Sequence, residues 1–144
     1  LKRALRLGYS LSLMLIDIDH LRDINLRYGH EVGDLVLIEV AKILKSSVRE
    51  IDMPARWGGE ELVTVLHETD AEGAAVVAER VRRRVSMLEI EDPKTKKPIK
   101  VTATLAVASY PAHSNEPQGL LEAACEALIT AKDKGCNAVI VANR

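Results

Sequence analysis

Aromatic residues are scarce in this sequence: phenylalanine is absent, and aromatic residues make up only 3% of the 144 positions. The hydrophobic residues, 47% of the chain, are therefore mostly aliphatic and must fill the core. A chain of this length can bury about two thirds of its unfolded surface. We expect residues 1–144 to form one globular domain without internal repeats or linkers.

An excess of charge of either sign is also missing, because 20 basic and 21 acidic residues give a formal net charge of -1. This balance excludes bulk attraction to nucleic acid or to an anionic membrane. The sequence shows no signal peptide and no apolar run of membrane-spanning length. We therefore expect a cytoplasmic domain that makes no membrane contact through this segment.

Several familiar catalytic signatures are absent. The two cysteines, Cys125 and Cys136, lack metal-ligand spacing, which predicts packing thiols in a reducing compartment and not a disulfide or a zinc site. No Gly-x-x-x-x-Gly-Lys-Ser/Thr motif occurs, which argues against a P-loop NTPase. Neither a Ser–His nor a Cys–His nucleophile pair stands out.

Strands and helices alternate along the chain. We expect strands at 11–18, 53–57, 62–66, 99–109 and 138–141, and helices at 1–7, 20–28, 32–48, 71–88 and 117–134. Asp70 is placed to cap the helix at 71–88, and 93–98 reads as a solvated turn. The hairpin around Gly58-Gly59 forces one antiparallel pair into the sheet. The expected fold class is α/β (α+β), with a mixed central sheet flanked by helices.

Two acids end the apolar run of 11–18. Asp17 and Asp19 are two residues apart, so in a strand both project from one face at its C-terminal end, where ligands of open α/β sheets gather. Asp17 lies inside the apolar run and needs a partner or a metal ion. Asp19 has two interpretations, a site residue or the cap of the following helix.

Two more acids follow the paired glycines. Adjacent glycines permit a tight turn or a close approach to a ligand, although a plain hairpin tip is the simpler alternative. Side chains alternate along a strand, so Glu60 and Glu61 leave on opposite faces. If the hairpin lies beside 11–18, Asp17 and Glu60 converge, and paired carboxylates suit Mg²⁺. The residues alone favour metal-assisted phosphoryl or nucleotidyl transfer.

Three separate segments resemble the GGDEF domain of diguanylate cyclases: Asp17-Ile18-Asp19, the segment 25–34, and Gly58-Gly59-Glu60-Glu61-Leu62. With 131–137 included, the resemblance covers nearly the whole chain. It implies condensation of two GTP into cyclic di-GMP, a bacterial second messenger, with release of two pyrophosphates. It also implies a palm-like fold similar to the nucleotidyl cyclase core, a homodimer for catalysis, and an N-terminal regulatory domain in a longer protein.

The resemblance also assigns catalytic roles. Asp17, the backbone carbonyl of Ile18 and Glu60 would hold two Mg²⁺ ions at each GTP site, with Mn²⁺ as an alternative ion. Glu61 would either assist deprotonation of the 3′-hydroxyl or support metal binding. Asp17, Glu60 and Glu61 are thus the expected catalytic residues.

Substrate contacts are implied in the same way. Asn25 and Asp34 would read the guanine edge, since an Asp accepts from the N1–H and amine that adenine cannot present together. The remaining implied contacts are His20, Leu21, Arg22 and Gly59 near the phosphates and Lys132 at the terminal phosphates. Structural alternatives exist: Asn25 could face solvent, Asp34 could support a helix start, and Lys132 could complement a helix dipole.

A further stretch, Arg49-Glu50-Ile51-Asp52, resembles the family's RxxD inhibitory site, where the product binds. Arg49 can fork onto guanine or phosphate, and Asp52 can accept from guanine. The alternative is an ordinary ion pair at a helix end.

The sequence departs from the family pattern at several positions: Leu21, Arg22, Leu26, Leu62, Ala106, Cys125, Ile129 and Cys136. The most consequential is Cys136, which stands where an Arg usually contacts phosphate and leaves Lys132 as the clearer cation. Weaker GTP binding and reduced turnover are expected. Because all the acids are retained, an active cyclase is favoured over a degenerate, non-catalytic sensor that binds GTP or cyclic di-GMP.

Overall fold

The computed structural model describes residues 9–52, 54–56 and 61–142. The elements in chain order are β1 (Leu11–Ile18), α2 (Leu21–Tyr28), α3 (His30–Ser47), β2 (Pro54–Arg56), β3 (Glu61–His67), α4 (Ala71–Ser86), β4 (Glu89–Glu91), β5 (Pro98–Lys100), β6 (Ala103–Tyr110), α5 (Pro117–Asp133) and β7 (Val139–Val141). The expected helix at 1–7 and the glycines of the hairpin lie outside the described residues.

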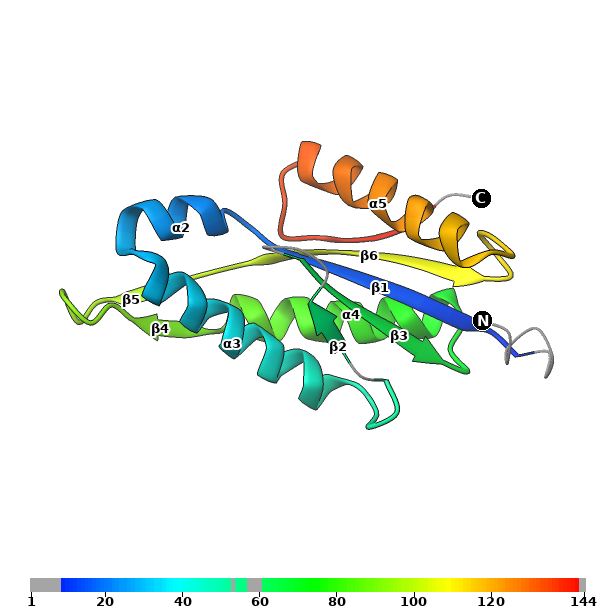
Figure 1. The fold of residues 1–144 in the computed structure, drawn as a ribbon, viewed down its shortest axis with the longest axis horizontal. Helices are drawn as coiled ribbons and strands as arrows, with labels where there is room; N and C mark the ends of the chain where they lie inside the picture. Colours follow the sequence, from blue (N-terminus) through cyan, green and yellow to red (C-terminus); the bar gives the residue numbers. More distant parts are fainter. Residues whose placement is uncertain (1–8, 53, 57–60, 143–144) are drawn as a thin grey trace.

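The main sheet has the strand order β2-β3-β1-β6-β7, so β1 lies at its centre (Figure 1). It pairs antiparallel with β3 on one side and with β6 on the other, while β6 and β7 are parallel. The expected mixed sheet is confirmed, and so is the position of the first strand beside the hairpin.

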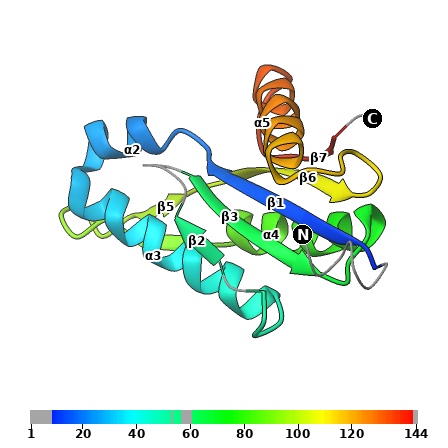
Figure 2. The same ribbon diagram turned by 45° about the vertical axis from the view of Figure 1, so that its right-hand side comes forward.

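Helices cover both faces of this sheet, with α3 and α4 on one face and α5 on the other (Figures 1 and 2). Successive side chains of a strand point to opposite faces. Accordingly Met14 and Ile16 join the core cluster of α3 and α4, whereas Leu11 and Leu15 join the cluster of α5. The central strand is therefore buried on both faces, as its unbroken apolar run predicts.

The region after α4 corrects the sequence prediction. The strand expected at 99–109 is two strands, because β5 leaves the main sheet and pairs with β4 as a separate hairpin. Asp92 organises the turn between them: its carboxylate accepts from the backbone N–H of Lys94 and the hydroxyl of Thr95, at 3.1 and 2.9 Å.

Helix boundaries differ by a few residues from those expected, and α3 begins two residues earlier, at His30. The predicted cap of α4 is confirmed, since the N–H of Gly73 donates to the Asp70 carboxylate at 2.8 Å. None of the helices in the described part of the chain combines the length and apolarity that crossing a bilayer requires.

Candidate active site

The end of β1 brings acids from two strands together. Asp17 lies directly opposite Glu61 on β3 and opposite Thr104 on β6. Residues directly opposite in an antiparallel pair project from the same face of the sheet. Asp17 and Glu61 therefore both project from the face that α5 covers. Glu60 and Gly59, which were expected to complete this site, lie outside the described residues.

Asp19 projects from the same face and is fully buried. Its carboxylate accepts from the hydroxyls of Thr102 and Thr104, both at 2.7 Å, from Lys132 Nζ at 2.7 Å, and from the backbone N–H of Asn137 at 2.9 Å. These four donors come from the β5–β6 connection, β6, α5 and the turn before β7. Asp19 therefore fastens four parts of the chain to the end of β1.

The interpretation of Asp19 as a helix cap is wrong. The N-cap of α2 is His20, and its own side chain makes no capping hydrogen bond. The reason is burial: a carboxylate enclosed beneath α5 needs donors on every side, and the sheet and α5 supply them.

Lys132 links the two aspartates of β1. Its ammonium lies 2.7 Å from Asp19 Oδ1 and 3.3 Å from Asp17 Oδ2, and its side chain is 25% exposed. The alternative in which Lys132 serves only the dipole of α5 is therefore wrong, because the side chain is held in the acidic cluster.

Burial and ion pairing act in opposite directions on this pair. Burial on its own would raise the pKa of Asp19, but the hydrogen bonds from Lys132, Thr102, Thr104 and Asn137 outweigh it and lower that pKa. For Lys132, burial would lower the pKa, but the hydrogen bond to Asp19 and the charges of both aspartates raise it. Asp19 and Lys132 are thus both charged at neutral pH.

The donor chemistry at this end of the sheet fits a hard cation. Asp17, Asp19 and Glu61 project from one face, where Lys132 contacts both aspartates, so the formal charges of these four side chains leave an excess of two negative charges. Carboxylate and carbonyl oxygens are the ligands that Mg²⁺ prefers. Within the described ranges, no three acidic, histidine or cysteine residues form a metal-binding group by themselves. The expected ligand set includes Glu60, which lies beyond those ranges.

The β1–α2 turn adds backbone donors. His20 adopts a left-handed conformation with φ of 58°, and α2 starts at the next residue. The first N–H groups of a helix have no acceptor inside the helix, so Leu21 and Arg22 present theirs at the helix start. The side chain of Leu21 is buried in the core, whereas that of Arg22 is exposed. An anion at this turn would meet these N–H groups and the positive end of α2.

Asn25 of α2 packs against α3, and a glycine makes this possible. A Cβ added at Gly33 would lie only 1.6 Å from Asn25 Oδ1. The amide of Asn25 thus occupies the space that any side chain at position 33 would take. Asn25 is half-buried, so the alternative in which it faces solvent is wrong.

Asp34 follows Gly33 in α3 and is exposed. The helix starts at His30, and its first-turn acid is Glu31. Because dipole effects fade beyond the first turn, the helix-start role considered for Asp34 is wrong. The structure therefore places Asn25 beside the residue that precedes Asp34.

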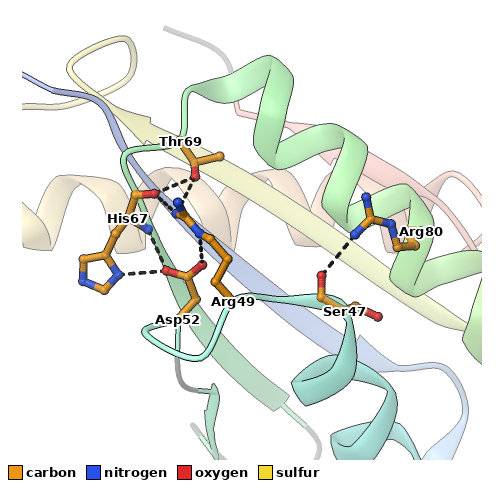
Figure 3. A network of polar contacts seen from close by, with 6 residues as sticks. All are labelled: Ser47, Arg49, Asp52, His67, Thr69 and Arg80. Carbon is orange, nitrogen blue, oxygen red and sulfur yellow. Dashed lines mark hydrogen bonds and ion pairs between the residues drawn. The ribbon is translucent and has the colours of Figure 1, made fainter.

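A second polar cluster lies after the end of α3, beside His67, which ends β3 at the opposite end of the strand from Glu61 (Figure 3). Asp52 is 2% exposed and accepts from Arg49 Nε at 3.0 Å. It also accepts from the backbone N–H and ring Nδ1 of His67, both at 2.9 Å. Arg49 Nη2 donates to the backbone carbonyl of His67 and, at 3.3 Å, to the hydroxyl of Thr69. Arg49 and Asp52 thus form the helix-end ion pair that was the structural alternative.

The surface beside this cluster is hollowed. One pocket of about 620 Å³ is lined by Lys45, Arg49, Glu50 and Asp52 together with apolar neighbours. A second, of about 360 Å³, joins Arg49 and Asp52 to Thr69 and Arg80. Burial would raise the pKa of Asp52, but the hydrogen bonds from His67 and Arg49 outweigh it and lower that pKa.

Both cysteines are free thiols, as expected. Burial raises the pKa of Cys125, and the nearby negative charge of Glu61 raises it further, so this thiol stays protonated. Cys136 adopts φ of 64° in the turn between α5 and β7, and its thiol lies 3.8 Å from the carbonyl oxygen of Lys132.

Both the sequence and the fold are similar to those of known proteins. The sequence matches the family model described as diguanylate cyclase, GGDEF domain, over residues 1–138. It is 43% identical over 130 residues to diguanylate cyclase A of Treponema denticola, covering 90% of this chain and 34% of that protein.

Two solved structures are similar throughout. The active GGEEF domain of a diguanylate cyclase from Vibrio cholerae has a TM-score of 0.89 at 31% identity, covering 99% of this chain and 89% of that one. The GGDEF domain of DgcB from Caulobacter crescentus, solved in complex with c-di-GMP, has a TM-score of 0.89 at 28% identity, covering 97% and 82%. The chain spans about a third of the length of the curated relatives it matches.

Proposed function

Since the chain belongs to the GGDEF domain family of diguanylate cyclases, we propose that it condenses two GTP molecules into cyclic di-GMP and releases two pyrophosphates. The observation that carries the proposal is the pairing of Asp17 with Glu61 across β1 and β3, beside a lysine that bridges Asp17 and Asp19. This pairing brings acids that can bind metal ions and accept a proton to one end of the sheet, together with a lysine that can bind phosphate.

We assign the metal site to Asp17, the carbonyl of Ile18 and Glu60. Two Mg²⁺ ions per GTP, or Mn²⁺ in their place, would lower the pKa of the attacking 3′-hydroxyl and draw charge from the triphosphate. Glu61, opposite Asp17, accepts the proton of that hydroxyl or supports the carboxylates that hold the ions.

The triphosphate is expected to lie between Lys132 and the β1–α2 turn. Lys132 contacts the terminal phosphates while Asp19 keeps its ammonium at this end of the sheet. Backbone N–H groups at His20, Leu21 and Arg22, together with Gly59, receive the remaining phosphate oxygens. Cys136 stands where the family usually has an Arg, which leaves Lys132 as the clearer cation for phosphate and predicts weaker GTP binding.

The base of GTP is expected between α2 and α3. Asp34 accepts from the N1–H and the exocyclic amine of guanine, and Asn25 offers both a donor and an acceptor from its amide. Gly33 supports this arrangement because it leaves room for the amide of Asn25 against α3. Adenine lacks the matching donor pair, so the site favours GTP over ATP.

Each domain binds one GTP, and the product contains two nucleotides. We propose that two domains form a two-fold homodimer in which the two bound nucleotides face each other head to tail, which converts a bimolecular encounter into a local one. In the whole protein, an N-terminal regulatory domain in the cytoplasm would control this assembly.

The pocket beside Arg49 and Asp52 is the proposed site of product inhibition. It combines a guanidinium with a buried carboxylate, the two groups that recognise guanine by its Hoogsteen edge and by its N–H groups. The complex of the DgcB domain with c-di-GMP shows that a similar fold binds this molecule.

Incubation of the domain with GTP and Mg²⁺, followed by chromatography, tests the activity. We expect cyclic di-GMP and pyrophosphate from the unmodified protein, and a loss of about 100-fold or more in Glu61→Gln, because general acid–base groups contribute about that much. GTP binding without product at any enzyme concentration would instead identify a non-catalytic nucleotide sensor.

A further inference from the structure

The carboxylate of Asp52 has almost no acceptor capacity left. An ionised carboxylate offers about four lone-pair sites, two on each oxygen. Oδ1 receives the backbone N–H and the ring Nδ1 of His67, and Oδ2 receives Arg49 Nε. Among the bonds between described residues, three of the four sites are therefore in use. One site remains, on Oδ2.

Arg49, in contrast, still has hydrogen-bond donors that its internal contacts do not use. Its Nε and Nη2 groups are engaged by Asp52, the carbonyl of His67 and Thr69 (Figure 3). A guanidinium has five N–H donors, and the two on Nη1 are not needed for these contacts. Arg49 can thus bind the Hoogsteen edge of a base or a phosphate without losing its internal partners.

Guanine needs two acceptor sites from a carboxylate, one for its N1–H and one for its amine. Asp52 can provide the second only if one of its present donors leaves. The backbone N–H of His67 is fixed by the strand, and Arg49 is required by the ligand. The imidazole of His67 is the donor that can leave, because its side chain is 38% exposed and has solvent to turn into.

We propose that the His67 side chain is a gate on the product-inhibition site: in the closed state its Nδ1–H occupies Asp52, and cyclic di-GMP binds after the ring has turned away. This inference rests on the proposed inhibitory function of Arg49 and Asp52. A carboxylate only accepts, so Nδ1 must carry the proton in the closed state. The ring thus opposes product binding and keeps the enzyme active at higher product concentrations.

Two substitutions at position 67 distinguish the loss of the Nδ1–H donor from a general effect of changing this side chain. His67→Leu removes the donor and keeps a side chain of moderate size, so Asp52 gains a free acceptor site. His67→Asn places an amide N–H at the position of Nδ1 and keeps the gate closed. We expect calorimetric titration with cyclic di-GMP to show binding on the order of tenfold tighter in His67→Leu, the worth of one hydrogen bond to a charged group. His67→Asn should bind within about twofold of the unmodified protein.

Arg49→Ala serves as the reference without a site, and His67→Ala replaces His67→Leu if the latter fails to fold. Equal or weaker binding by the variant without the donor, with Arg49→Ala still abolishing binding, would overturn the gate and leave the inhibitory site standing. If no protein in the series shows binding that depends on Arg49, the assignment of the inhibitory site is wrong, and the proposal of a gate is overturned as well.

Discussion

Asp17 and Glu61 lie opposite each other on the adjacent strands β1 and β3, on the one face of the sheet that α5 covers. Forty-four positions separate them in the sequence, and only the antiparallel register brings them together. Because α5 carries Lys132 onto the same face, acids and cation meet at the C-terminal end of the central strand. The proposed catalysis depends on this meeting point.

The ion pair of Lys132 with Asp19 should matter for both stability and substrate binding. Lys132→Met leaves Asp19, whose side chain has no exposed surface, without its charged partner. We expect the free energy of unfolding in urea to fall by about 3 kcal/mol, the low end for a broken buried pair, because Thr102 and Thr104 still donate to the carboxylate.

The matched variant Lys132→Arg keeps the charge and should lose less stability. In the double variant Asp19→Asn/Lys132→Met, the fully buried side chain at position 19 carries no charge, so part of the lost stability should return. The Michaelis constant for GTP should nevertheless stay high in that double variant. A double variant with normal GTP binding would show that Lys132 does not contact substrate.

Gly33→Ala should weaken GTP binding although alanine favours helices. In an ordinary helix interior this change stabilises by about 0.5–1 kcal/mol. Here the new Cβ would overlap Asn25 Oδ1 at 1.6 Å, so the amide must move. We expect a several-fold increase in the dissociation constant for GTP, measured by calorimetry, and poorer discrimination against ATP.

Gly73→Ala in α4 is the control for this experiment. Its Cβ would meet Thr69 Cγ2 at 3.2 Å and can be accommodated by a small shift. Unchanged GTP affinity is expected there. If both alanine variants bind GTP equally well, Asn25 does not read the base.

The stability of the protein should depend on the ionisation of Asp52. Its pKa is lowered in the folded state by the bonds from His67 and Arg49, which outweigh burial. The unfolded chain therefore takes up the proton first as the pH falls. The stabilisation is complete above the unfolded value of about 4 and is lost as the pH falls through it towards the lower folded pKa.

Urea unfolding at about pH 6 and about pH 3 measures this effect. The unmodified protein should lose more stability between the two conditions than Asp52→Asn, which has no proton to take up at this position. Equal losses in the two proteins would mean that the ionisation of Asp52 contributes nothing to the pH dependence of stability.

Activity should rise more than linearly with enzyme concentration. One GTP binds to each domain, so the productive species is the dimer, and its fraction grows with concentration until association is complete. Initial rates of cyclic di-GMP formation over a hundredfold dilution series should approach second order at the dilute end. A rate per domain that stays constant across the series would contradict assembly during turnover.

Local signals explain most of the fold that could be predicted. The apolar run of 11–18 gave its strand with the right bounds, because a short run of this kind ending in acids has few alternatives. Asp70 marked the start of α4 because its carboxylate can cap the first N–H groups of a helix. The β4–β5 hairpin was missed because Glu89-Ile90-Glu91 has little strand character of its own. It is a strand only because it pairs with residues beyond the turn at Asp92.

The candidate site was harder, because its contacts are distant in sequence. The sequence left two interpretations of Asp19 open, because its donors Thr102 and Asn137 lie 83 and 118 positions away. The contact between His67 and Asp52 spans 15 positions, and no local pattern marks it. The resemblance to a family placed Asp17 and Glu61 in one site, and the register sets them opposite each other, whereas the partners of Asp19 and Asp52 required the fold.

The most direct test is a crystal structure of the domain with Mn²⁺ and a GTP analogue that cannot be condensed, in which anomalous scattering locates the ions. The account predicts Mn²⁺ at the end of β1, bound to the carboxylates of Asp17 and Glu60 and to the carbonyl of Ile18, with guanine between Asn25 and Asp34. Nucleotide and Mn²⁺ bound together at any place from which Asp17 is absent would contradict it.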